Sequence, residues 1–221
     1  MSTDVKRTPE KTPAQQRAAQ GLATRTSLVE AARQLFGVRG YAETSLDEIV
    51  AAAQVTKGAL YHHFRGKDEL FAAVYEQVQR EVSDRVVAEF LREDPWEALQ
   101  LGCELWIDAH LDPAVQRIAM RDARSTLGWE AIRDVESRFG AVPLRGVLRR
   151  ALRKGLIGPY PLRPLALMVM GTLNEACFYV ADADDREAAR EEVRALMARF
   201  LSGLSQDPHA PVDTESGTIG H

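Results

Sequence analysis

The residues of this chain with the clearest chemistry are the hydroxyl, phenol, imidazole and ammonium groups gathered between residues 44 and 67. Within residues 55–64, the apolar side chains Val55, Leu60 and Phe64 recur at the spacing of one face of a short helix. The remaining face carries hydrogen-bond donors and one glycine: Thr56, Lys57, Gly58, Tyr61, His62 and His63. Such donors suit phosphate oxygens and base edges, and a glycine lets the backbone approach closely. The pattern predicts a helix that enters the major groove of DNA.

A second short helix is expected directly before this one. A hydroxyl residue begins each helix, at Thr44 or Ser45 and again at Thr56, because its oxygen accepts from the free amides of the first turn. Ser45 and Glu48 also have the spacing of a capping box. Two short helices in succession, followed by a third that begins at Lys67, predict a helix-turn-helix.

The string of residues 55–64, with Lys67 after it, resembles the signature of the tetracycline-repressor (TetR) family. The resemblance is tight over residues 24–75, and the rest of the chain resembles the family in its helical pattern and length. It implies phosphate contacts by one set of side chains: Thr44, Thr56, Tyr61, His62, His63 and Lys67. It places Lys57 and Gly58 near base edges. Where the family carries glycine in the turn, this chain has Gln54, which is disfavoured in a left-handed conformation, so we expect a slightly different turn in the same fold.

The charge of the chain is divided unevenly. The net charge is −4, yet residues 1–67 hold 10 Lys or Arg against 6 Asp or Glu, and residues 68–221 hold 18 against 26. The basic charge therefore coincides with the DNA-reading motif, and the rest of the protein is acidic. This asymmetry predicts a small phosphate-binding module on a body that does not cling to DNA.

Composition and periodicity predict an all-α protein with four segments. Residues 1–20, polar and basic with two prolines, are expected to form a flexible arm. Residues 21–67 form a three-helix helix-turn-helix DNA-binding domain. Residues 68–205 form a helical-bundle domain for ligand binding and dimerisation, and residues 206–221 are expected to be a disordered tail.

A long helix joins the two domains. Apolar residues repeat at steps of three and four over about 24 residues after Lys67, which corresponds to about 36 Å of helix. Such a helix can transmit a displacement from the body to the DNA-reading helix. Farther along, residues 129–154 read as one amphipathic segment that Pro143 bends or divides.

The last two helices are expected to form a homodimer interface. Residues 165–183 are almost wholly apolar, so two opposite faces need cover, and residues 185–204 follow with Leu196 expected to point inward. Twofold symmetry suits a protein that reads a palindromic operator, because paired half-sites raise affinity and selectivity. The alternative is that the apolar helix is the centre of a monomeric bundle.

The body is larger than dimerisation requires, and we expect it to bind a small-molecule effector. Small-molecule pockets are mostly apolar and aromatic with a few polar groups. Candidate ligand-binding residues of that kind are Trp106, His110, Arg121, Trp129, Met168, Asn174 and Phe178. Each could instead fill or bond within the core. The expected protein is a repressor that leaves its operator when the effector binds.

Other classes of function find less support. The sequence has no metalloprotease, nucleophile-elbow, phosphate-loop or dinucleotide motif, so no catalytic residue, cofactor or metal is expected. Asp108, His110 and Asp112 have the only metal-like spacing, but they do not share one helix face. A regulator without a ligand, an architectural protein or an activator remain alternatives, although architectural binders need a broad basic surface. No unbroken run of about 20 apolar residues and no signal-peptide core are present, so we expect a cytoplasmic protein without a membrane partner.

Overall fold

The computed structural model describes residues 12–205, and over that range the chain is helical. An isolated bridge between Ile157 and Ser205 is the one extended pairing within those residues. The all-α prediction is confirmed. The chain divides into two compact units, Met1–Val74 and Tyr75–His221. The division falls inside the long helix α4, Lys67–Phe90, and not at its start as the sequence suggested.

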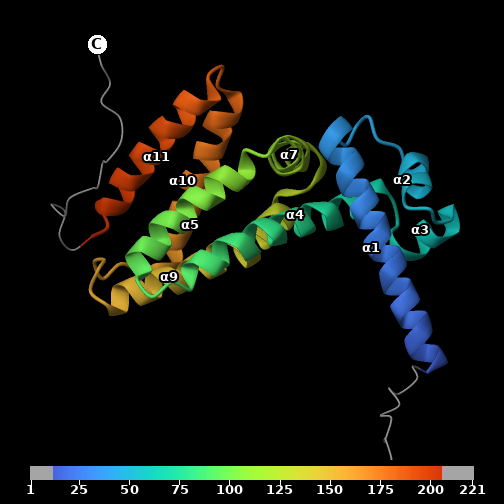
Figure 1. The fold of residues 1–221 in the computed structure, drawn as a ribbon, viewed down its shortest axis with the longest axis horizontal. Coiled ribbons are helices and arrows are strands. Elements are labelled where there is room, and N and C mark those ends of the chain that lie inside the picture. The colour runs from blue at the N-terminus through green and yellow to red at the C-terminus, as the bar shows by residue number, and fades with distance from the viewer. Residues whose placement is uncertain (1–11, 206–221) are drawn as a thin grey trace, which may run out of the picture. The chain divides into compact units, whose positions relative to one another are not determined.

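The first unit consists of α1 (Pro13–Arg39), α2 (Leu46–Ala52), α3 (Lys57–His63) and the first turns of α4. The short helices α2 and α3 both pack on α1 (Figure 1). Large apolar side chains with no exposed surface form the core of this unit: Leu28, Phe36, Ile49, Leu60 and Phe71. Phe36 meets Phe71 edge-on with ring centroids 5.2 Å apart. These contacts give the two short helices a rigid support.

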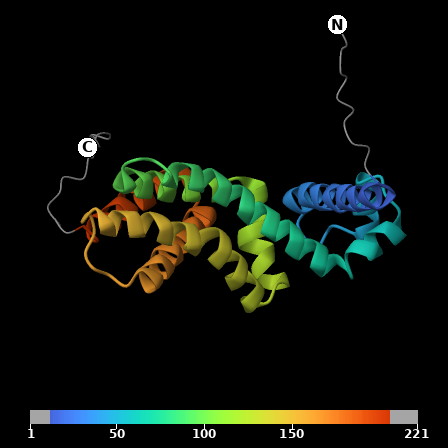
Figure 2. The same ribbon diagram turned by 90° about the horizontal axis from the view of Figure 1, so that it is seen from below.

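Helix α1 begins earlier than the sequence analysis expected. It runs unbroken from Pro13 (Figure 2), so the second part of the predicted flexible arm is helical. Thr12 explains the early start, because its hydroxyl accepts from the Gln15 amide while the Gln15 side chain accepts from the Thr12 amide, which completes a capping box. Pro13 at the first helical position fits the same arrangement. Residues 1–11 of the predicted arm lie outside the described residues, as does the predicted tail 206–221.

The second unit contains the remainder of α4 and a series of further helices. Their bounds are α5 (Pro95–His110), α6 (Pro113–Val115), the π-helical segment η1 (Gln116–Asp122), α7 (Ala123–Thr126), α8 (Trp129–Glu136), the π-helical segment η2 (Ser137–Ala141), α9 (Val142–Arg153), α10 (Leu162–Asp182) and α11 (Arg186–Ser202). Helix α10 packs against α5, α9, α11 and η2, so it is the central helix of this unit.

The expected division near Pro143 takes the form of a π-helical turn. The segment η2 separates α8 from α9, and Pro143 lies at the start of α9. Because proline has no amide hydrogen, it cannot donate to the helical ladder at this position. The single amphipathic segment of the sequence is therefore two helices joined by a locally widened turn.

The end of α4 is fastened by an arginine of α9. The Arg150 guanidinium donates to the carbonyl oxygens of Phe90 and Arg92, and also to that of Glu93 at 3.2 Å. Lys154 donates to the same Glu93 oxygen at 3.1 Å. Phe90 is the last residue of α4, and the last carbonyls of a helix lack partners within the helix. These two cations therefore hold the end of α4 and the turn after it against α9.

Helix α10 is long and apolar enough to cross a membrane by length and composition, which the sequence analysis did not anticipate. One of its faces is buried in the helical unit, with Leu165, Val169, Leu173 and Cys177 at most 7% exposed. That burial is typical of the core helix of a globular domain.

Candidate nucleic-acid interface

The residues predicted to read DNA gather on the outer face of α3. Thr56 begins the helix, and its hydroxyl accepts from the Ala59 amide at 3.1 Å. Leu60 and Phe64 are buried beneath the helix, and Tyr61 is 53% exposed on the opposite side. Lys57, Gly58 and His62 are exposed as well. A row of donors thus projects from a helix whose inner face is fixed by packing.

The turn that precedes α3 contains a strained residue. Gln54 has φ of 55°, the one positive φ of a non-glycine residue in the described chain. The left-handed region places the side-chain Cβ too close to the backbone for most residues. Gln54 therefore adopts the left-handed conformation that the sequence analysis considered disfavoured for it.

Lys57 is engaged before any DNA is present. Its ammonium lies 2.6 Å from a carboxylate oxygen of Asp47 on α2, and both side chains are largely exposed. The hydrogen bond to this carboxylate holds the Lys57 pKa above its usual value. A phosphate or base edge must therefore compete with Asp47 for the lysine, a partner that the sequence did not indicate.

The two histidines at the end of α3 have different surroundings. Their rings meet edge-on with centroids 5.1 Å apart. His62 is exposed, whereas His63 is half-buried beside α1. A Cβ placed on Gly21 of α1 would lie 3.8 Å from the His63 ring. His63 thus contributes to the contact between α1 and α3, and His62 is the freer of the two.

Lys67 lies at the start of α4 and is held by the loop after α1. Its ammonium is 4.2 Å from the centroid of the Tyr41 ring and donates to the Ala42 carbonyl at 3.4 Å. The Tyr41 hydroxyl in turn donates to the Asp68 carboxylate. Burial, followed by that hydrogen bond, raises the Tyr41 pKa to about 12, so the phenol stays protonated. Tyr41 is a positioning residue that sequence reasoning missed.

Thr44 differs from its predicted role. Its side chain is 1% exposed, and its hydroxyl donates to the Gly40 carbonyl at 2.8 Å. A buried hydroxyl that already has a partner is not presented to a phosphate. Ser45, which is exposed, provides the N-cap of α2 and forms the expected capping box with Glu48. Thr44 therefore fixes the loop between α1 and α2.

Comparison with known proteins agrees with this geometry. Residues 28–74 match the family model described as "Bacterial regulatory proteins, tetR family", and residues 96–204 match "Tetracyclin repressor-like, C-terminal domain". A crystal structure of a TetR-family transcriptional regulator from Pectobacterium atrosepticum is 34% identical, with a TM-score of 0.75, over 89% of this chain and 98% of that one. The chain belongs to the TetR family. It is a DNA-binding transcriptional regulator of helix-turn-helix type.

Two further proteins are similar to most of the chain at lower identity. The transposon Tn10 TetC protein of Escherichia coli is 25% identical over 181 residues, which are 82% of this chain and 92% of TetC. RolR, solved in complex with resorcinol, has a TM-score of 0.64 and 22% identity over 89% of this chain and 100% of RolR. The second of these likenesses concerns the fold alone.

Most of the residues predicted to bind a ligand do not lie together in the second unit of this TetR-family chain. Trp129 and Met168 are 69% and 63% exposed, and Arg121 is exposed as well. None of these three side chains lines the cavity that contains Trp106.

Two of the remaining candidates are held by other polar or charged groups. Asn174 is half-buried and donates to a Glu136 oxygen at 3.1 Å. The Arg124 guanidinium lies 3.8 Å from the centroid of the Phe178 ring.

Trp106 and His110 are the candidates that lie deep in the second unit. They are 3% and 1% exposed, and their ring centroids are 4.7 Å apart. Trp106 lines a cavity together with residues that were not predicted to bind a ligand, among them Phe90, Cys103 and Gly140. Local spacing could not bring these residues together, because they lie on three separate segments.

Proposed function

We propose that the protein is a homodimeric repressor that reads a palindromic operator with α3 and leaves it when a small molecule binds the second unit. The observation that carries the DNA-reading role is the exposed row of donors on α3, backed by an apolar core. The excess of basic residues in residues 1–67 also supports the proposal that the unit containing α3 contacts the phosphates of DNA.

Dimerisation is supported by an apolar strip on the last two helices. Leu167, Met168 and Tyr179 of α10 are 43%, 63% and 55% exposed, and Leu196 of α11 is 67% exposed. The Tyr179 hydroxyl donates to Glu192 at 2.8 Å, which links α10 to α11 beside the strip. Leu196 was expected to point inward, and its exposure adds to the strip instead. We propose that a second copy covers this strip through an isologous contact.

The DNA-reading role can be tested by selecting bound duplexes from a random pool and measuring their affinity by fluorescence anisotropy. Lys57→Ala and Tyr61→Ala should each weaken binding. Lys57→Ala should also reduce the salt dependence, because it removes a cation that displaces counterions from the phosphates. Arg153→Ala is the matched control, since Arg153 is an exposed cation of α9. Wild-type affinity in both α3 variants would refute the proposed interface.

The dimer can be tested by light scattering after size-exclusion chromatography. Met168→Glu and Leu196→Glu place charges on the strip, and we expect both to shift the protein toward monomers. Leu91→Glu is the control, because Leu91 is 76% exposed but lies in the connection after α4. A dimer that persists in both strip variants would refute the assignment of the interface.

The regulatory step requires a ligand with different affinities for the DNA-bound and released conformations. A differential affinity of about 1–3 kcal/mol, typical of allosteric coupling, changes operator occupancy by about 5- to 150-fold. Helix α4 has residues in both units and is the covalent route for this coupling. Unchanged operator affinity on saturation with a bound small molecule would favour the alternative, a regulator that acts without an effector.

A further inference from the structure

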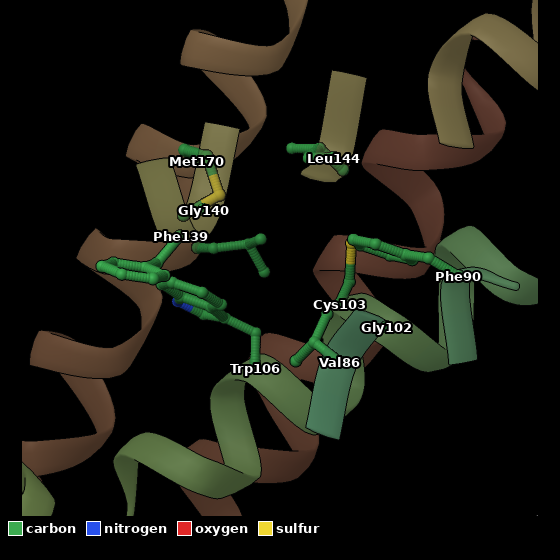
Figure 3. A pocket seen from close by; sticks show the side chains of 10 residues that line it. Val86, Phe90, Gly102, Cys103, Trp106, Phe139, Gly140, Leu144 and Met170 are labelled. Atoms are coloured by element: carbon green, nitrogen blue, oxygen red, sulfur yellow. The ribbon is translucent and has the colours of Figure 1, made fainter. Parts of the chain in front are cut away.

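A small cavity lies in the second unit among α4, α5, η2, α9 and α10 (Figure 3). Its walls are aromatic rings, aliphatic chains, one thiol and one thioether, with no charged side chain among them. Its free volume is about 10 Å³, which is room for about one water molecule. In this state the site is nearly closed by its own side chains.

One wall of the cavity carries an unused hydrogen-bond donor. Trp106 is 3% exposed, and its indole Nε1 is buried without a hydrogen-bond partner in the structure. Buried donors in native proteins almost always have a partner, so one that lacks it calls for an explanation. Figure 3 shows the Trp106 ring beside Phe139 at the cavity. An acceptor on a bound molecule would satisfy the donor.

Two walls of the cavity consist of side chains resting on glycines. A Cβ placed on Gly102 would lie 2.1 Å from the Phe90 ring, and one placed on Gly140 would lie 2.6 Å from Met170 Cε. The missing Cβ atoms thus provide the space that Phe90 and Met170 now occupy. Methionine adapts readily to different shapes, and Gly140 belongs to the π-helical segment η2, a type of turn frequent at functional sites. Rotation of these two side chains would enlarge the cavity.

The surroundings favour an uncharged occupant. His110 packs against Trp106, and burial lowers the His110 pKa to about 4. Burial also raises the pKa of the Cys103 thiol to about 12. Both groups are neutral near pH 7, so the cavity offers no counter-charge, and an ion would lose its hydration without compensation.

We infer that this cavity is the effector site, and that it takes a small, uncharged, mostly apolar molecule of about one aromatic ring with an acceptor that binds Trp106 Nε1. The inference rests on the proposed function, in which the second unit senses a small molecule. A dry apolar cavity of about 150 Å³ holds one benzene, so Phe90 and Met170 must rotate away from Gly102 and Gly140 to admit one ring. Val86 and Phe90 belong to α4, so opening the cavity displaces the helix that continues into the DNA-binding unit.

Three probes of similar shape separate the elements of this inference: acetophenone, ethylbenzene and benzoate. Binding is followed by the indole N–H signals in two-dimensional NMR, assigned with Trp96→Phe, Trp106→Phe and Trp129→Phe. We expect acetophenone to move the Trp106 signal and to bind about 2- to 10-fold more tightly than ethylbenzene, as one neutral hydrogen bond allows. Benzoate should leave the signal in place.

Trp106→Phe keeps a ring but removes the donor, so acetophenone should lose its advantage over ethylbenzene. Trp96→Phe is the matched control, because Trp96 is half-buried and is absent from the cavity walls, and the advantage should persist there. No movement of the Trp106 signal with acetophenone, equal binding of benzoate, or an advantage that survives Trp106→Phe would each overturn the inference.

Operator binding by the ligand-free protein is measured separately, by anisotropy with the selected duplex. Its failure would overturn the proposed function while leaving the probe results intact. Normal operator binding combined with failure of the probes would overturn only the assignment of the cavity.

Discussion

Replacement of Gln54 by glycine should stabilise the DNA-binding unit. Gln54 has φ of 55°, and the left-handed conformation costs an L-residue about 1–2 kcal/mol. Glycine removes that cost but gives up about 0.5–1 kcal/mol of additional backbone entropy on folding. The difference predicts a net gain of about 0.5–1 kcal/mol for Gln54→Gly. The gain should be visible as slower amide hydrogen exchange in α2 and α3, which reports local opening.

Two neighbouring substitutions test the cause of this gain. Gln54→Ala keeps a Cβ in the left-handed conformation and should give little or no stabilisation. Ala53→Gly introduces glycine where φ is −76°, and it should destabilise by about 0.5–1 kcal/mol. The reasoning fails if Gln54→Ala stabilises as much as Gln54→Gly, or if both glycine variants change stability in the same direction.

Three further outcomes concern charge. Asp47→Asn releases Lys57 and should tighten binding to the selected duplex, with a steeper salt dependence by anisotropy; unchanged binding would show that the pair does not compete with DNA. The Glu136 pKa is raised by burial, so the native state binds the extra proton and wild-type stability falls as pH rises above about 4.5. Glu136→Gln should therefore stabilise near pH 7 but not near pH 4 in urea titrations, and an equal effect at both would contradict this. Burial lowers the His110 pKa from 6.5 to about 4, so the unfolded state binds more protons than the native state between pH 6.5 and pH 4. The free energy of unfolding should therefore fall by up to about 3 kcal/mol as the pH drops across this range. His110→Asn should flatten that part of the urea-derived pH profile, and an unchanged profile would refute the cause.

Local patterns in the sequence were sufficient to predict α2, α3 and α4 and the outer face of α3. The bounds of α4 and the capping box at Ser45 follow from residues within a few positions of one another, and the structure confirms both. The early start of α1 also had a local signal, the capping box of Thr12 and Gln15. The polar composition of residues 1–20 predicted a flexible arm instead.

Contacts between segments distant in the chain could not be predicted from the sequence. Thr44 carries a hydroxyl suited to phosphate, but the Gly40 carbonyl and the packing of α1 on α2 bury it. Met168 was expected at a pocket, but the helix face that it occupies is set by how α10 packs on its neighbours. Gly102 and Gly140 gave no signal of a site, because a missing Cβ has meaning only when the side chain opposite it is known.

Arg150 of α9, which binds the end of α4, restricts which residues the fold tolerates at position 150. The guanidinium of Arg150 donates to three carbonyl oxygens, those of Phe90, Arg92 and Glu93, from a single planar fork. A lysine has the same charge but gathers its hydrogens at one point, so it cannot span oxygens that face different directions. Replacement of Arg150 by lysine would leave some of these carbonyl oxygens without a hydrogen-bond partner. Related sequences should therefore keep arginine at position 150, even where arginine and lysine replace one another at neighbouring positions.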